Sequence, residues 1–190
     1  YKRQGNYDVT LTITDLVNGC ENSYTGQVVS LIVPIASISS NPSNGCMPLE
    51  VNFINTSLNA QFYSWDFGDG NTSNNSTPVN TYLNDGNYYV TLMAENINGC
   101  VDTSSTFVDV HPLPVADFTI VYNSSCILPA SISFINNSVG AINYNWNFGD
   151  GGAANSTSPT HNYQNSGQYN VHLAVENIYG CVDSITNTVI

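Results

Sequence analysis

The stretch that decides the fold is Gly86–Leu92, which reads GNYYVTL. The same pattern recurs as GNYDVTL at Gly5–Leu11 and as GQYNVHL at Gly167–Leu173, and each copy begins 81 residues after the one before it. Apolar side chains at every second position are typical of a strand that packs one face against a core. Self-similarity at a fixed spacing indicates a tandem array of one structural unit. The sequence therefore predicts a repeated β-structure.

Two more motifs recur at spacings of 80 or 81 residues and set the boundaries of the repeats. The turn Asn-Gly-Cys at Asn18–Cys20 recurs at Asn98–Cys100, and as Tyr-Gly-Cys at Tyr179–Cys181. The hexapeptide WDFGDG at Trp65–Gly70 recurs as WNFGDG at Trp146–Gly151. We expect the front half of the first repeat to lie upstream. The predicted organisation is the C-terminal part of one repeat at residues 1–34, followed by complete repeats at 35–112 and 113–190.

Each repeat is expected to fold as a sandwich of two sheets. Short alternating runs occur around Val51 and Phe53, and again around Tyr63, Trp65 and Phe67. No segment keeps a helical period, and the abundant Asn, Ser and Thr residues disfavour helix interiors. Short strands with turn signals between them favour an immunoglobulin-like arrangement. The predicted fold class is all-β, built of tandem Ig-like β-sandwich repeats.

The Gly-Asp-Gly segments predict tight turns, because Gly accepts positive φ and the Asp carboxylate caps the turn. The hexapeptide around them resembles the signature of PKD (polycystic kidney disease) domains. The positions that carry this structural motif are Trp65, Asp66, Gly68, Asp69 and Gly70 in one repeat, and Trp146, Asn147, Gly149, Asp150 and Gly151 in the next.

The resemblance continues downstream of the hexapeptide, with two departures. Pro159, His161 and Tyr163 match the family's Pro-x-His-x-Tyr run, and His161 is expected to make a hydrogen bond in a turn or the core. Asn80 stands where the other repeat should have this His, and Asn147 replaces the first Asp of the signature. Neither change threatens the fold, but both argue against a shared ligand site at these positions.

The resemblance also implies a setting and a role. PKD domains are extracellular Ig-like modules that serve as spacers or adhesive units, and they occur beside catalytic domains in secreted hydrolases. Long arrays with paired cysteines are similar to those of Bacteroidota surface proteins, including gliding-type adhesins. The expectation is an extracellular location at a bacterial cell surface.

The five cysteines follow the repeat. Cys46 and Cys126 precede equivalent strands, whereas Cys20, Cys100 and Cys181 close equivalent turns. The simplest pairing lies within a repeat, Cys46 with Cys100 and Cys126 with Cys181, and Cys20 would then pair with an upstream cysteine. Other pairings are open to five cysteines, but the pairing within a repeat is taken as the one that obeys the period. Recurring disulfides indicate an oxidising, exported environment.

The scarcity of basic residues argues against one class of partner. The only basic residues are Lys2 and Arg3, against 14 acidic residues in the whole chain. Nucleic acid is therefore not expected as a partner, since neutralising phosphates requires Lys and Arg.

No apolar run reaches the length of a membrane span. No nucleophile stands beside a base and an orienting acid, so we expect no catalytic residues and no enzyme activity.

Calcium is the one cofactor that the sequence suggests. Carboxylates suit this ion, and Asp66, Asp69 and Asp85 are the candidates for convergence at one end of a sandwich. No Asp-x-Asp-x-Asp run repeats, so solvated turns are the simpler interpretation of these residues. No other metal or cofactor is expected.

The functional hypothesis is an extracellular structural or adhesive module that acts as a spacer or fibre-forming stalk of a large bacterial surface protein. Its expected partners are other repeats of the same chain, further copies in a fibre, and surface glycans or proteins. The first alternative is an accessory region of a secreted hydrolase that acts on polysaccharide or protein. The second is a carbohydrate-binding module, in which outward Tyr and Phe side chains would stack on sugars.

Overall fold

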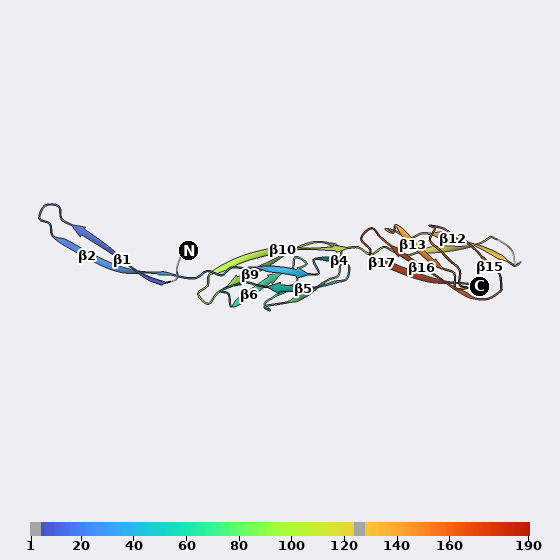
Figure 1. The fold of residues 1–190 in the computed structure, drawn as a ribbon, viewed down its shortest axis with the longest axis horizontal. Coiled ribbons are helices and arrows are strands. Elements are labelled where there is room, and N and C mark those ends of the chain that lie inside the picture. Colours follow the sequence, from blue (N-terminus) through green and yellow to red (C-terminus); the bar gives the residue numbers. More distant parts are fainter. Residues whose placement is uncertain (1–4, 124–127) are drawn as a thin grey trace. The chain divides into compact units, whose positions relative to one another are not determined.

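The chain consists of β-strands joined by turns (Figure 1). The computed structural model describes residues 5–123 and 128–190, and no helix occurs among them. None of these residues forms a helix with the length and apolar character of a membrane span. The all-β class is thereby confirmed. The strands are β1 (Gly5–Thr14), β2 (Glu21–Ser30), β3 (Ile38–Asn41), β4 (Asn44–Cys46), β5 (Leu49–Asn55), β6 (Phe62–Asp66), β7 (Thr72–Ser73), β8 (Val79–Tyr82), β9 (Gly86–Glu95), β10 (Val101–His111), β11 (Phe118–Tyr122), β12 (Ala130–Asn136), β13 (Asn143–Asn147), β14 (Ala153–Ala154), β15 (Thr160–Tyr163), β16 (Tyr169–Glu176) and β17 (Val182–Val189).

The structure divides into two compact units, and each is described by itself. The first unit contains residues 1–41, 52–80 and 89–107. The second unit contains residues 42–51, 81–88 and 108–190.

The first unit begins with an antiparallel hairpin. Strands β1 and β2 pair in continuous register from Gly5 opposite Ser30 to Thr14 opposite Glu21. Further along, β3 pairs with β5, and β6 pairs with both β7 and β9, all antiparallel. The centroids of the Phe53 and Trp65 rings lie 5.6 Å apart. These residues belong to β5 and β6, which lie in different sheets, so the buried faces of the two strands pack against each other as the alternation predicts.

The second unit contains a complete sandwich. One sheet has the strand order β11-β12-β15, and the other has the order β14-β13-β16-β17. The indole of Trp146 is fully buried at the centre, and its Nε1 donates a hydrogen bond to the Ser156 carbonyl at 3.0 Å. Apolar residues of both sheets close around it, among them Phe118, Ile132, Phe134, Phe148, Val171, Leu173 and Val175.

The period-two pattern has the phase that the sequence predicts. Val171, Leu173 and Val175 are buried, whereas His172 between them is exposed. Burying a side chain of this size contributes about 1.5–3 kcal/mol. The alternation therefore accounts for which face of β16 joins the core.

Candidate functional site

The Gly-Asp-Gly turns need glycine for two reasons. Gly68 has φ of 78°, and a Cβ atom there would lie 2.8 Å from the Tyr89 carbonyl oxygen. Gly149 has φ of 83°, and its Cβ would lie 2.7 Å from the Asn170 carbonyl oxygen. A side chain at either position would be strained and would also collide with the backbone of the neighbouring strand. These glycines are therefore requirements of the fold.

The first acidic position of the motif caps its turn, which explains why Asn can replace Asp. Asp66 Oδ1 accepts a hydrogen bond from the Gly68 amide at 2.9 Å. Asn147 Oδ1 accepts the same bond from the Gly149 amide, also at 2.9 Å. An amide oxygen and a carboxylate oxygen serve equally in this turn.

The second departure from the family pattern has a similar explanation. Asp69 Oδ2 accepts a hydrogen bond from Asn80 Nδ2 at 2.8 Å. In the other repeat, Asp150 Oδ2 lies 2.8 Å from His161 Nε2. A carboxylate is an acceptor, so His161 donates from Nε2. Asn80 and His161 thus perform the same task in their repeats, which is to connect the turn to β8 and to β15, respectively.

Two ionisable groups near this turn have shifted pKa values. Burial raises the pKa of Asp150, but hydrogen bonds from His161 and the Gly152 amide, with the charge of His161, outweigh it. The net pKa of Asp150 lies below its ordinary value. Burial, followed by the charge of Asp150, raises the pKa of Tyr163, whose hydroxyl donates to the Phe148 carbonyl at 2.9 Å. Tyr163 therefore stays a proton donor inside the sandwich.

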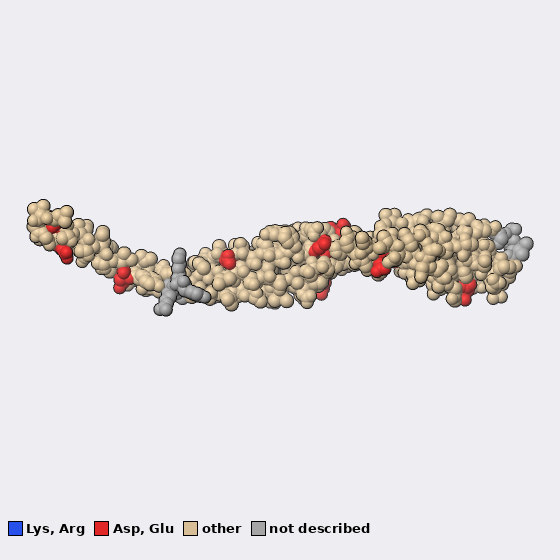
Figure 2. All heavy atoms as spheres, turned by 45° about the horizontal axis from the view of Figure 1, so that its top comes forward, with Lys and Arg blue, Asp and Glu red and all other residues tan. Residues whose placement is uncertain are grey.

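The calcium candidates have other roles in the structure. Asp66 and Asp69 cap turns, and Asp85 is exposed immediately before β9. Within residues 5–123 and 128–190, no group of three or more His, Cys, Asp or Glu side chains is placed to hold a metal ion. In the view of Figure 2, the acidic side chains are spread over the surface, without one large cluster.

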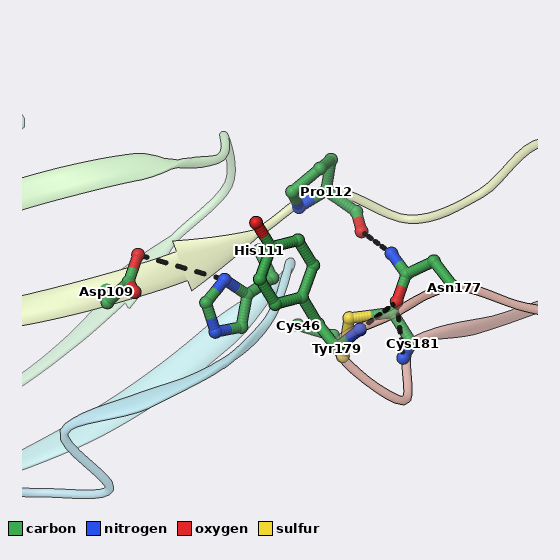
Figure 3. The surroundings of a disulfide bond; sticks show 7 residues. All are labelled: Cys46, Asp109, His111, Pro112, Asn177, Tyr179 and Cys181. Carbon is green, nitrogen blue, oxygen red and sulfur yellow. Dashed lines mark hydrogen bonds and ion pairs between the residues drawn. A yellow bond between two sulfur atoms is a disulfide. The ribbon is translucent and has the colours of Figure 1, made fainter. Parts of the chain in front are cut away.

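The candidate functional feature is a disulfide bond between Cys46 and Cys181 (Figure 3). Their Cα atoms lie 5.6 Å apart, although the residues are separated by 135 positions in the sequence. The predicted pairing of Cys46 with Cys100 is therefore wrong, because Cys100 has a free thiol. Cys181 is consequently not available for the predicted bond to Cys126, which itself lies outside the described residues. Cys20 is also a free thiol in the structure.

The position of β4 explains the unexpected pairing. This short strand runs parallel to the end of β10, so that Cys46 lies opposite His111. The Met47 amide continues the contact by donating to the His111 carbonyl at 3.0 Å. Cys46 is thereby fixed where β10 leads into the next repeat, rather than beside the turn of its own repeat.

Cys181 is held in place by the Asn177 side chain. Asn177 Oδ1 accepts hydrogen bonds from the amides of Tyr179 and Cys181 at 2.9 and 3.0 Å. Its Nδ2 donates to the Pro112 carbonyl at 2.8 Å. One buried amide thus shapes the Gly-Cys turn and ties it to the segment that follows β10.

An aromatic pair lies beside the disulfide. The His111 and Tyr179 rings are stacked, with centroids 4.0 Å apart and planes within 4°. His111 Nδ1 also lies 3.8 Å from Asp109 Oδ1. Figure 3 shows both rings next to the sulfur atoms. Sequence reasoning missed the roles of Asn177, His111 and Tyr179. Tyr179 stands in the recurring turn motif, but its stacking on His111 depends on a contact between residues far apart in the sequence.

A shallow groove occurs on each repeat at equivalent positions. The first is lined by Tyr63 and Glu95 among others, and the second by their counterparts Tyr144 and Glu176. Asn143 Nδ2 donates to Glu176 Oε2 at 2.9 Å in the second groove. The first groove therefore offers two aromatic rings and the second offers one, and each groove also has amide groups and one carboxylate.

Two successive β-sandwich modules joined by a disulfide define the class of this protein as a tandem Ig-like repeat protein. The family model described as "PKD domain" matches residues 33–111 and again residues 109–190. The chain belongs to the PKD domain family, as the hexapeptide predicts.

Three of the curated relatives that match the chain are collagenases. Collagenase ColA of Clostridium perfringens is 27% identical over 207 residues, which cover 94% of this chain and 18% of that protein. The microbial collagenase of Vibrio alginolyticus is 42% identical over 45 residues, which cover 24% of this chain and 6% of that protein. The chain thus spans less than a fifth of the length of these relatives.

Among solved structures, the PKD1 domain of the Vibrio cholerae metalloprotease PrtV is 34% identical, with a TM-score of 0.37. The match covers 42% of this chain and 98% of that domain. The PKD1 domain of Vibrio anguillarum Epp is 26% identical with a TM-score of 0.38, and covers 43% of this chain and 96% of that domain.

Proposed function

We propose that this chain is a non-catalytic structural region of an extracellular bacterial protein, in which linked PKD domains act as a stiff spacer or stalk. The observation that carries the proposal is the Cys46–Cys181 disulfide. Cys46 lies in the segment matched at 33–111, and Cys181 lies in the segment matched at 109–190. The bond therefore joins two consecutive domains covalently.

Noncovalent contacts act at the same place. The Asn177 side chain binds the Pro112 carbonyl, and Asp183 Oδ2 accepts the Ala116 amide at 2.8 Å. Both bonds attach the start of the last repeat to its own Gly-Cys turn. A linker held at two points and closed by a disulfide has little freedom to bend, which is the property that a spacer needs.

The disulfide bond supports an extracellular location. Disulfides persist in secreted and surface proteins and are rare in the cytosol. The finer proposal is a surface protein of the kind found in Bacteroidota, such as a gliding-type adhesin, in which long arrays carry an adhesive tip. Lateral assembly into a fibre is a further part of the proposal, and copies would have to pair against the like-charge repulsion of a net charge of -12.

Small-angle X-ray scattering of the chain tests the spacer proposal. Ensemble fits to the scattering of the oxidised protein should give a narrow distribution of the maximum dimension of the molecule. Cys46→Ser should broaden that distribution. Cys100→Ser is the matched control, because it removes a thiol that forms no bond. An oxidised protein as broadly distributed as Cys46→Ser would overturn the proposal.

The alternative, an accessory region of a secreted hydrolase, is favoured by the collagenase relatives. In that role the modules would position a catalytic domain on polysaccharide or protein. The test is deletion of residues 33–190 from the native polypeptide. Loss of activity on an insoluble substrate, with activity on a soluble peptide unchanged, supports this role; no hydrolytic activity in the intact polypeptide rejects it.

Carbohydrate binding is a second candidate, favoured by the groove that recurs on both repeats. Tyr rings and amide groups are the side chains that stack on and hydrogen-bond to sugars. A glycan array probed with the intact chain tests this role. Binding that is lost when Tyr63→Ala and Tyr144→Ala are combined but kept in Tyr179→Ala supports it, whereas an array without signal rejects it.

A further inference from the structure

The turn that ends at Cys100 is built in the same way as the turn that ends at Cys181. Asn96 Oδ1 accepts the amides of Asn98 and Cys100, both at 3.0 Å. Its Nδ2 donates to the Ile32 carbonyl at 2.7 Å. In the next repeat, Asn177 makes the same three bonds, and there the cysteine is in a disulfide.

A second contact repeats as well. Asp102 Oδ2 accepts the Ala36 amide at 2.8 Å, and Asp183 Oδ2 accepts the Ala116 amide at 2.8 Å. The linker before each complete repeat is thus attached to that repeat's Gly-Cys turn at two matching points. Cys100 consequently holds the same place relative to its linker as Cys181 does.

The partner of Cys181 comes from β4, which pairs with the last residues of β10. The counterpart of β10 in the first hairpin is β2. Among the described residues, β2 pairs with β1 alone, in a sheet of two strands. The edge that would receive a strand equivalent to β4 is therefore open beside the linker to which Asn96 binds.

The first hairpin also has an uncovered apolar face. Val9, Leu11 and Ile13 are exposed by 56%, 61% and 65%. A contiguous exposed apolar face marks a surface that a partner covers. In the next repeat this face is covered by the front half of the domain, and the equivalent residues Val90, Leu92 and Ala94 are fully buried.

We infer that Cys100 forms a second disulfide between domains, with the cysteine of a β4-like strand that belongs to an N-terminally adjacent PKD domain of the same polypeptide. The front half of that domain covers the β1–β2 face and brings its cysteine to the end of β2. Each domain would thereby be joined to the next by one bond. This inference rests on the proposed function and deepens it.

Formation of this disulfide bond requires an oxidant. The two thiols lose two protons and two electrons as the S–S bond forms. The acceptor is the disulfide of a thiol–disulfide oxidoreductase, which is reduced to its dithiol. Such enzymes act in the same exported compartment that the Cys46–Cys181 bond requires.

Peptide mapping of the full-length native protein tests the inference. The protein is alkylated without reduction and cleaved after Glu95 and after Asp102, so that Cys100 is the only cysteine in the peptide 96–102. We expect this peptide to be joined to one from outside residues 1–190, whose cysteine stands where Cys46 stands in its repeat. Cys100 found alkylated, or bonded to Cys20, Cys126 or a second copy of this chain, would overturn the inference.

A graft tests the geometry directly in the recombinant chain. Tyr1 occupies the repeat position of Tyr82, so residues 33–81 placed before Tyr1 continue the repeat in register and supply a front half with a second copy of Cys46. We expect Cys100 to lose its reaction with a thiol reagent and to bond with the grafted cysteine. The control is the same graft with its Cys46 copy replaced by Ser, in which Cys100 stays reactive.

The outcomes separate the inference from the proposed function. A grafted cysteine that bonds Cys20, or a Cys100 that remains reactive, contradicts the inference while the Cys46–Cys181 bond and the spacer proposal stand. A flexible Cys46–Cys181 chain in scattering contradicts the spacer proposal whatever the state of Cys100.

Discussion

Cys46 and Cys181 lie in two separately matched PKD domains, yet their Cα atoms are 5.6 Å apart and their sulfur atoms are bonded. The short strand β4 carries one cysteine to the end of β10, and the Asn177-capped turn carries the other. A disulfide in this position connects the end of one domain to the next, whereas a bond inside a domain would leave the linker free.

The first prediction concerns the energetic weight of this bond. Cys46→Ser should lower the free energy of unfolding by about 3–5 kcal/mol, because a cross-link that spans so many residues strongly restricts the unfolded chain. Denaturant unfolding under non-reducing conditions measures it. Cys100→Ser is the matched control and should change stability by less than about 0.5 kcal/mol, as a substitution away from special contacts does. Equal effects of the two variants would contradict the account.

The second prediction separates two glycines of one turn. Gly149→Ala should destabilise by more than about 3 kcal/mol, because it combines positive φ with a collision against the Asn170 carbonyl. Gly151→Ala should cost only about 1–2 kcal/mol, since its φ is 96° but its Cβ would meet nothing within 4 Å. Thermal unfolding of both variants decides the matter, and a smaller loss for Gly149→Ala would refute the close-approach argument.

The third prediction uses the difference between the two repeats. A Cβ on Gly152 would lie 2.5 Å from His161 Cε1, and the other repeat has Asn71 and Asn80 at these positions. Gly152→Asn alone should destabilise by about 1–3 kcal/mol. Adding His161→Asn should recover most of the loss, with a coupling energy of about 0.5–3 kcal/mol in a double-mutant cycle. Additive effects would show that the two positions do not constrain each other.

The fourth prediction is a dependence of stability on pH. The pKa of Asp150 is below its ordinary value in the folded state, so its contribution is present above the unfolded pKa and is lost as pH falls through the folded pKa. Stability should therefore decline below about pH 4, and Asp150→Asn should flatten part of that decline. Unfolding free energies measured from pH 6 down to pH 2 give both curves, and parallel curves would argue against the Asp150 contacts.

The local features were predictable from the sequence because they depend on neighbouring residues. Alternation in residues 169–175 places Val171 and Leu173 in the core, and the structure buries both. The Gly-Asp-Gly turns follow from the residues that such turns require. The collision that fixes Gly149 was not visible, since it involves the backbone of Asn170, which approaches only in the folded sandwich.

The disulfide was mispredicted for a specific reason. A bond from Cys46 to the cysteine of its own repeat and a bond to the cysteine of the next repeat satisfy the period equally well. What decides between them is the parallel pairing of β4 with the end of β10, and a strand of three residues leaves no periodic signal. Asn177 was missed because its role depends on a carbonyl 65 positions away.

The most direct test of the link between domains is peptide mapping of the oxidised chain after cleavage at glutamate. The four Glu residues leave Cys46 in the peptide 22–50, Cys181 in 177–190 and Cys100 in 96–176. We expect the peptides 22–50 and 177–190 to be joined and to separate on reduction. A bond between 22–50 and 96–176 would contradict it, because Cys46 would then be bonded elsewhere than to Cys181.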